Sequence, residues 1–327
     1  MSTPLKKHDL IRNRYKIRNI IGQGGMGCIY QAEDSRLKGR LCALKEVEHD
    51  RTLNDRLHQE AREQFKQEAN ILARLDHPNM PKVSDFFSIG NRDYLIMDYI
   101  PGDDLRMIML KAKHQGKFLR ESEVRNWANQ LADALIYLHH QKPPIVHRDI
   151  KPSNLKLSES GLLKLVDFGL VKLMAPGEMT ITIIQGQGTA LYTPLEQYGG
   201  DGSHTDIRSD IYSFGATLYH LLTNTAPADA RARFIDPNVL IPPKQLNNSI
   251  STQLERAILW AMNLHPDERP QSVTQLRDYF TGNSIVIEVN RNVDGSLRGF
   301  LQKTAGKIIS LITVGLMILS LLAVILS

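Results

Sequence analysis

Residues 147–154 read His-Arg-Asp-Ile-Lys-Pro-Ser-Asn, and they place a carboxylate, an ammonium group and an amide within six positions. Transfer of a phosphoryl group to a hydroxyl requires a carboxylate that orients the hydroxyl and accepts its proton. It also requires a cation on the transferring group and oxygen ligands for Mg²⁺. Asp149, Lys151 and Asn154 supply one of each. The stretch therefore predicts a phosphoryl-transfer site.

A second carboxylate, that of Asp167, follows Asp149 in the sequence. Eighteen residues after Asp149 the chain reads Asp167-Phe168-Gly169, directly after the apolar run Leu162–Val166, which we predict to be a strand. The Asp167 carboxylate and the Asn154 amide would together offer Mg²⁺ the oxygen ligands that it prefers. Each residue alone could be an ordinary surface group, so the prediction rests on their joint order and spacing.

A glycine cluster lies between two predicted strands, Tyr15–Ile21 and Cys28–Glu33. Gly22, Gly24 and Gly27 would let the backbone approach phosphate oxygens closely. Alone this pattern is weak, because about half of isolated matches are ordinary turns. A dinucleotide site is excluded, since a strand rather than a helix follows the glycines.

Lys45 lies in the β-prone run Leu41–Val47 with apolar neighbours, so its ammonium group needs a partner. Glu68, on a predicted helix over residues 53–75, can supply it. The alternative is a surface lysine on an edge strand, facing one solvated row of glutamates (Glu60, Glu63 and Glu68). Without the other motifs we would favour that alternative.

The remaining pattern predicts an α+β chain in two lobes. Residues 15–100 are strand-rich with one helix, and Phe86–Ile89 and Tyr94–Ile100 are predicted to form a hairpin. Residues 101–280 have helical periodicity, as in Val124–His139. A long loop is predicted over residues 170–205, a polar extension over 1–14 and a linker over 281–307.

Composition limits the classes of binding partner and the cysteine chemistry that we expect. The chain has 327 residues, a net charge of +5 and two cysteines. The small, dispersed charge excess does not indicate nucleic-acid binding. Two cysteines exclude a disulfide scaffold, and we expect Cys28 and Cys42 to be reduced thiols rather than a redox switch. The His139-His140 pair is expected to be solvated at a helix end.

The C-terminal 20 residues, 308–327, carry no charge and are mostly Ile, Leu and Val. A helix of that length spans about 30 Å, the thickness of a bilayer core. We predict a single transmembrane helix over 308–326, in preference to a buried core helix. The basic residues before it predict that everything upstream is cytoplasmic; they are Arg291, Arg298, Lys303 and Lys307.

These motifs together resemble the eukaryotic-type (Hanks-type) Ser/Thr protein kinases, particularly the membrane-anchored bacterial members. The resemblance covers roughly residues 15–280 and implies a bilobal fold, with an N-lobe over 15–100, a C-lobe over 101–280 and ATP in the cleft. It implies protein Ser/Thr hydroxyls as substrates and Mg²⁺, or alternatively Mn²⁺, as the metal.

The resemblance also assigns roles to residues. Asp149 would be the catalytic base, Lys151 would neutralise the γ-phosphate, and Lys45 would contact the α- and β-phosphates. Asn154 and Asp167 would hold the metal. The nucleotide-binding positions implied are Ile21, Gly22, Gly24, Gly27, Ile29, Ala43, Lys45, Glu68, Met97, Asp98, Ile100 and Asn154. Glu196 and Arg269 match a buried ion pair, and Asp210 matches an aspartate that supports the catalytic loop.

Two departures from the family pattern are visible. Pro194-Leu195-Glu196 stands where Ala-Pro-Glu is usual, so the peptide-docking shelf is expected to differ. The separation of 23 residues between Lys45 and Glu68 is slightly long, which leaves Glu63 as a second candidate partner.

The resemblance implies regulation through the segment between residues 170 and 194. Arg148 would bind a phosphate group on this segment. We expect autophosphorylation at Thr180 or Thr182, with self-association, and a structural role for Thr189. Alternatively, the threonines lie on a flexible loop and have no regulatory role. The competing functions are a nucleotide-binding pseudokinase scaffold, which the complete catalytic set disfavours, and a small-molecule kinase.

Overall fold

The computed structural model describes residues 3–24, 27–49, 55–167, 187–198 and 205–282. Among them no helix is long and apolar enough to cross a membrane. The predicted transmembrane helix 308–326 and most of the predicted linker 281–307 lie outside the described residues, as does most of the loop predicted over 170–205.

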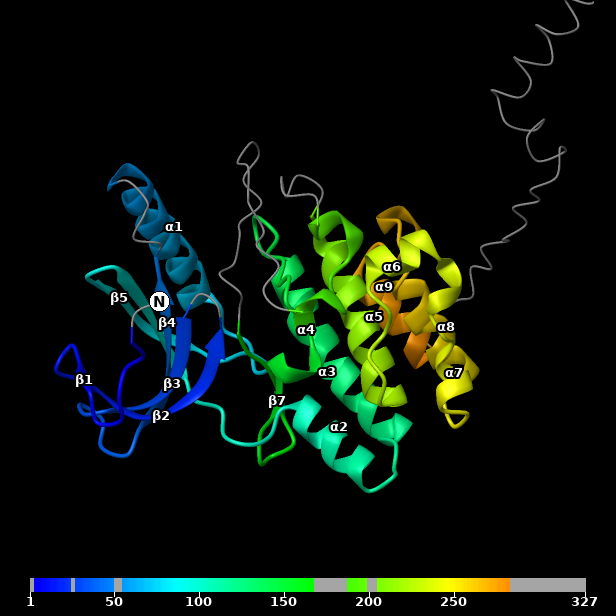
Figure 1. The fold of residues 1–327 in the computed structure, drawn as a ribbon, viewed down its shortest axis with the longest axis horizontal. Coiled ribbons are helices and arrows are strands. Elements are labelled where there is room, and N and C mark those ends of the chain that lie inside the picture. The colour runs from blue at the N-terminus through cyan, green and yellow to red at the C-terminus, as the bar shows by residue number, and fades with distance from the viewer. Residues whose placement is uncertain (1–2, 25–26, 50–54, 168–186, 199–204, 283–327) are drawn as a thin grey trace, which may run out of the picture. The chain divides into compact units, whose positions relative to one another are not determined.

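The N-terminal lobe is an antiparallel sheet in the order β1-β2-β3-β4-β6-β5 with one helix, α1, packed against β5 and β6 (Figure 1). The bounds are β1 Leu10–Ile11, β2 Tyr15–Gly24, β3 Gly27–Asp34, β4 Leu41–Glu48, α1 Asp55–Arg74, β5 Val83–Ile89 and β6 Arg92–Asp98. Because β4 lies between β3 and β6, Lys45 is on an interior strand, and the edge-strand alternative is wrong.

The two faces of this sheet are covered differently. One face packs Ala43, Val47 and Leu95 into a core that α1 shares and that continues into the large lobe. The other face buries Tyr15, Tyr30 and Leu44 and their neighbours in a second cluster. This division follows from the alternation of side chains along each strand.

The first residues of the chain lie on that second cluster, which the sequence did not predict. The Leu5 N–H donates to the Tyr30 hydroxyl (2.9 Å), and Arg92 donates to the Thr3 carbonyl (3.0 Å). Beneath them the buried Glu46 carboxylate accepts from Tyr94 (3.0 Å) and Arg92 (3.1 Å). Residues 3–11 are therefore part of the folded lobe.

The C-terminal lobe is helical (Figure 1). Its elements are α2 Leu105–His114, α3 Glu121–His139, η1 Pro152–Asn154, β7 Leu155–Leu157, β8 Leu163–Leu165, α4 Gln187–Ala190, η2 Leu195–Gln197, α5 Ile207–Thr223, α6 Ala230–Ile235, η3 Pro237–Val239, α7 Pro243–Leu246, α8 Thr252–Ala261, η4 Pro266–Glu268 and α9 Val273–Thr281. The α5 helix is the centre of this lobe, since fourteen of its residues are buried. Gly215 permits the close contact of α5 with α8, because an added Cβ would lie 2.8 Å from the Ala261 Cβ.

Candidate active site

Asp149 contacts both of the other predicted catalytic-stretch residues, Lys151 and Asn154. Both of its carboxylate oxygens lie 2.8 Å from the Lys151 ammonium group, and the Asn154 side-chain amide donates to its Oδ2 (2.8 Å) and its carbonyl (2.8 Å). Lys151 also donates to the Thr189 hydroxyl (3.0 Å). The structure thus brings together the carboxylate, cation and amide predicted from residues 147–154, and it places Thr189 beside them.

Asp210 on α5 fixes the backbone of this loop through hydrogen bonds. Its carboxylate accepts from the His147 N–H (2.9 Å) and the Arg148 N–H (2.8 Å), and it is fully buried. Burial alone would raise the pKa of Asp210, but the hydrogen bond from His139 and the nearby charges lower it overall. The predicted supporting role of Asp210 is confirmed in this geometry.

The expectation for His139 is wrong. Its side chain is only 6% exposed, and its Nε2 lies 2.9 Å from the Asp210 carboxylate, so it belongs to the support of the catalytic loop. Its neighbour His140 is exposed, as expected. Because His139 is the last residue of α3 on the buried side of the helix, the helical phase that places Leu135 and Leu138 in the core could have identified it.

Lys45 reaches across the lobes to Asp167. Its ammonium group lies 2.5 Å from the Asp167 carboxylate, and the Lys45 charge lowers the pKa of Asp167 against the opposing effect of burial. Glu68 is buried on α1, whereas Glu63 is exposed. The burial favours Glu68 as the glutamate that faces the site, while the Lys45–Glu68 pair itself stays a prediction.

Asn154 and Asp167 lie on neighbouring segments, because the Val166 N–H donates to the Asn154 carbonyl (2.8 Å). Their amide and carboxylate oxygens are hard donors of the kind that Mg²⁺ prefers. The described residues contain no group of three His, Cys, Asp or Glu side chains that could hold a metal. Asn154 and Asp167 are thus the two oxygen donors of this region that fit Mg²⁺ in chemical type.

Gly22 and Gly24 lie at the end of β2, and Gly27 begins β3. Gly24 pairs with Gly27, and Gly22 pairs with Ile29. An added Cβ on Gly27 would lie 1.9 Å from the Glu46 carbonyl oxygen on β4, so only glycine fits this approach. The start of β3 is thereby held against the strand that carries Lys45.

Several of the predicted nucleotide-binding positions lie on the adjoining strands. Ala43 and Met97 are cross-strand partners on β4 and β6, both buried, and Ile29 is partly buried against the same core. Asp98 and Ile100 follow at the end of β6 and are partly exposed. Ile21 on β2 is 46% exposed.

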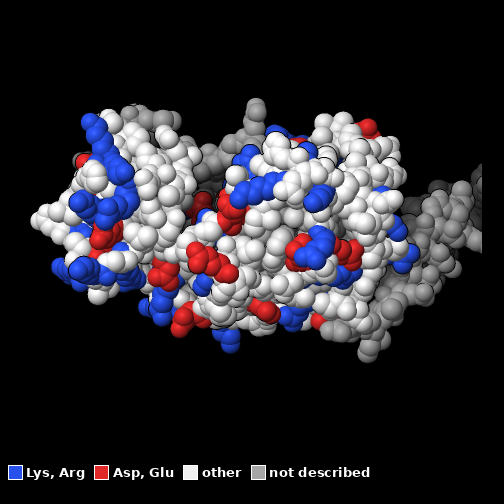
Figure 2. All heavy atoms as spheres, turned by 90° about the horizontal axis from the view of Figure 1, so that it is seen from below, with Lys and Arg blue, Asp and Glu red and all other residues white. Residues whose placement is uncertain are grey.

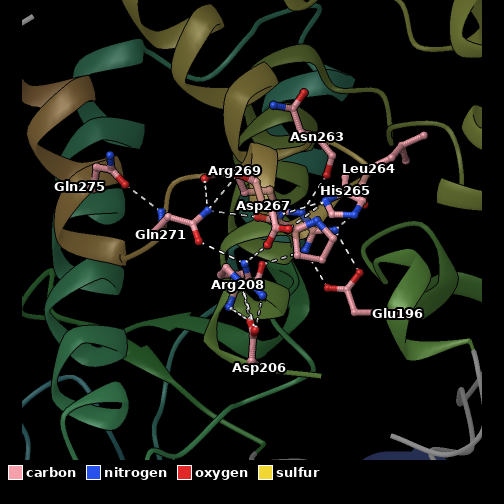
Figure 3. Close-up of polar contacts among 11 residues, drawn as sticks. Glu196, Asp206, Arg208, Asn263, Leu264, His265, Asp267, Arg269, Gln271 and Gln275 are labelled. Atoms are coloured by element: carbon pink, nitrogen blue, oxygen red, sulfur yellow. Dashed lines mark hydrogen bonds and ion pairs between the residues drawn. The ribbon is translucent and has the colours of Figure 1, made fainter. Parts of the chain in front are cut away.

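A buried ion pair braces the large lobe (Figure 3). Both terminal guanidinium nitrogens of Arg269 contact the Glu196 carboxylate, at 2.6 and 3.0 Å. Arg269 also donates to three carbonyls, those of Asn263, Leu264 and Arg208. The predicted Glu196–Arg269 pair is confirmed. The shifted proline of Pro194-Leu195-Glu196 precedes η2 and leaves this contact intact.

Arg148 has two buried guanidinium nitrogens without hydrogen-bond partners among the described residues. Its backbone is in the left-handed region (φ +66°), and its Nε and Nη1 are buried and make no hydrogen bond within the part of the chain that the structure describes. Burial lowers the pKa of Arg148. The negative charges of Asp210 and Glu68 oppose this shift, but buried nitrogens without hydrogen bonds remain costly. Thr180 and Thr182 lie outside the described residues.

The cysteines are free, buried thiols on β3 and β4. Burial raises the pKa of Cys42 to about 11, which keeps that thiol protonated and unreactive. This agrees with the expected reduced thiols.

A family model described as a protein kinase domain matches residues 15–280. The chain belongs to this family. A probable serine/threonine-protein kinase of Clostridium acetobutylicum is 35% identical over 276 residues, covering 82% of this chain and 40% of the relative. The serine/threonine-protein kinase PknB of Mycobacterium leprae is 31% identical over 286 residues, covering 85% and 43%. This kinase-family chain thus spans about two fifths of the length of these curated relatives.

Solved structures agree on the fold. The kinase domain of PknI from Mycobacterium tuberculosis is similar to this kinase-family chain with a TM-score of 0.64 at 25% identity, covering 86% of this chain and all of that one. The bilobal architecture predicted from the sequence is confirmed.

Proposed function

We propose that this chain is an ATP-dependent protein kinase that transfers the γ-phosphoryl group of ATP to serine and threonine hydroxyls of proteins. The observation that carries the proposal is the fixed position of Asp149, which Lys151 and Asn154 hold from two sides while Asp210 fixes the backbone beside it. Positioned groups of this kind account for most of the catalysis in phosphoryl transfer.

The proposed chemistry follows from these contacts. The substrate hydroxyl oxygen forms a bond to the γ-phosphorus, the bond from that phosphorus to the bridging oxygen breaks, and the Asp149 carboxylate takes up the hydroxyl proton. The Lys151 ammonium group, which lies between Asp149 and Thr189, offsets negative charge on the transferring group.

Other residues would bind the nucleotide and the metal. Lys45 is proposed to contact the α- and β-phosphates, with Gly22, Gly24 and Gly27 above them. Asn154 and Asp167 are the proposed metal ligands. Bound Mg²⁺, or Mn²⁺, would neutralise the charge of the phosphates. Because Lys45 now pairs with Asp167 at 2.5 Å, nucleotide binding would draw this lysine toward the phosphates.

The proposal extends to regulation and location. Arg148, with buried nitrogens that lack partners, is proposed to receive a phosphate on Thr180 or Thr182 that one copy adds to another. Residues 308–326 are proposed to anchor the chain in a membrane with the kinase domain in the cytoplasm. Basic and acidic side chains are interspersed over the face in Figure 2, and we propose no nucleic-acid partner.

The deciding experiment replaces Asp149 with Asn and measures phosphate transfer to a generic protein substrate, with a small alcohol assayed in parallel. We expect transfer to fall by at least about 10³-fold, since the proton acceptor is lost, while ATP binding persists. Asp133→Asn, a change at an exposed aspartate paired with Arg277, is the matched control. Transfer by Asp149→Asn at the wild-type rate would refute the assignment, and transfer only to the alcohol would refute the protein substrate.

A further inference from the structure

An exposed arginine lies beside the catalytic loop. Arg106 is in the first turn of α2, and it makes no hydrogen bond or ion pair with the described residues. The start of α2 is fixed next to β7, because the Leu157 N–H donates to the Asp103 carbonyl (3.0 Å), and α2 also packs against η1. Since η1 ends at Asn154, Arg106 is carried by the helix that adjoins the catalytic stretch.

The charge of Arg106 acts on the segment that follows Thr189. Tyr192, three residues after Thr189, hydrogen-bonds through its hydroxyl to the His220 ring on α5 (2.5 Å). Helix α2, which carries Arg106, contacts α5, which carries His220, and the Arg106 charge acts on both Tyr192 and His220. Because Thr189 contacts Lys151, this places the positive charge at the side of the site where a peptide with its hydroxyl at Asp149 would lie.

Neither of the two aspartates that precede Arg106 forms an ion pair with it. Asp103 pairs with Lys111, and Asp104 accepts from the Met107 N–H as the N-cap of α2. Burial, with the added charges of Lys113 and Arg106, lowers the pKa of His220 to about 4, so the ring is neutral near pH 7.

We propose that Arg106 is a specificity-determining residue that selects protein substrates with an acidic side chain close to the phosphoacceptor serine or threonine. The inference rests on the proposed kinase activity and deepens it by naming the class of substrate. An exposed ion pair of this kind changes an association by up to about fivefold, and more where several acids contribute. Its effect also declines as salt rises.

The test compares three peptides with one central threonine, flanked on both sides by glutamate, by glutamine or by lysine. The full chain, incubated first with ATP and Mg²⁺, should phosphorylate the glutamate peptide with the highest kcat/KM and the lysine peptide with the lowest. Arg106→Glu should reverse this order. Arg256→Glu, the same charge change at an exposed arginine on α8, should keep the wild-type order.

The outcomes separate the two proposals. An unchanged order of peptides in Arg106→Glu would overturn the specificity role, as would an equal loss of rate on all three peptides, which would mean that Arg106 acts within the enzyme. Failure of the wild-type chain to phosphorylate any peptide or a generic protein substrate would overturn the kinase proposal itself. A preference of the wild type for glutamate that shrinks about fivefold in Arg106→Ala supports the inference.

Discussion

At the scale of single residues, burial sets the protonation of a histidine that contacts the segment after Thr189. His220 is half-buried on α5, and its ring accepts a hydrogen bond from the Tyr192 hydroxyl (2.5 Å). Desolvation disfavours the charged ring, and the positive charges of Lys113 and Arg106 act in the same direction. The neutral ring is thus a condition of the folded state rather than of the unfolded chain.

This condition predicts a pH dependence of stability. The pKa of His220 falls from 6.5 in the unfolded chain to about 4 in the folded one, so only the unfolded state gains a proton between these values. The contribution of the neutral His220 ring to the free energy of unfolding is therefore fully present above pH 6.5. It is lost as the pH falls from 6.5 to 4, by up to about 3 kcal/mol. In denaturant unfolding at pH 7 and pH 5, His220→Asn should show a smaller loss than wild type.

The matched control for that experiment is His140→Asn, because His140 is exposed at the end of α3. It should lose as much stability between pH 7 and pH 5 as the wild-type chain does. An equal loss in His220→Asn would contradict the prediction and point to another buried histidine, of which His147 is the obvious one.

At the scale of elements, local sequence patterns were sufficient where one strand or helix has one buried face. Residues 53–75 were predicted as a helix, and α1 runs over Asp55–Arg74. The run Leu162–Val166 contains β8, Leu163–Leu165. Neighbouring strands could not be assigned in this way, because the interior position of β4 depends on pairing with β6, which follows in sequence only after α1 and β5.

The segment that carries Thr180 and Thr182 provides the prediction at this scale. Recombinant protein incubated with ATP and Mg²⁺ should carry phosphate at one of the two threonines, and its activity should rise by about tenfold or more as Arg148 receives the anion. Mass spectrometry before and after incubation measures the phosphate. The double variant Thr180→Ala with Thr182→Ala should not be activated.

Asp149→Asn is the control for that experiment, since it should acquire no phosphate on its own but should accept it from the wild-type chain if one copy acts on another. Full activity of a wild-type preparation that carries no phosphate at either position would refute the role of the segment.

At the scale of the whole molecule, ordered motifs revealed more of the site than any single residue did. The sequence predicted Asp149, Lys151 and Asn154 as neighbours, and the structure confirms that they touch. It did not reveal His139 or Arg106, because the first acts through a residue 71 positions away and the second depends on the contact of α2 with distant segments. Long-range contacts of this kind leave no local pattern.

The proposed membrane anchor is tested on the full chain expressed in bacterial cells. The chain should sediment with membranes and resist a high-salt wash, because residues 308–326 would bury apolar side chains in the bilayer. A paired change, Leu316→Arg with Leu319→Arg, should release it, since each charge at mid-membrane costs about 2.5–3.5 kcal/mol. Ser327→Arg, at the end of the run, is the control. Sedimentation of the paired variant with membranes would contradict the anchor.

The segment that precedes the family match has a practical consequence for anyone who prepares this protein. The match begins at Tyr15, yet Leu5 and Ile11 pack on the sheet, and Thr3 accepts a hydrogen bond from Arg92. Trimming the gene to the match would remove the contacts of Leu5 with the Tyr30 hydroxyl and of Thr3 with Arg92. Tyr30 and Arg92 both contact Glu46, which is on the strand that carries Lys45. Expression should therefore start at Met1, and any affinity tag belongs ahead of that methionine with a spacer.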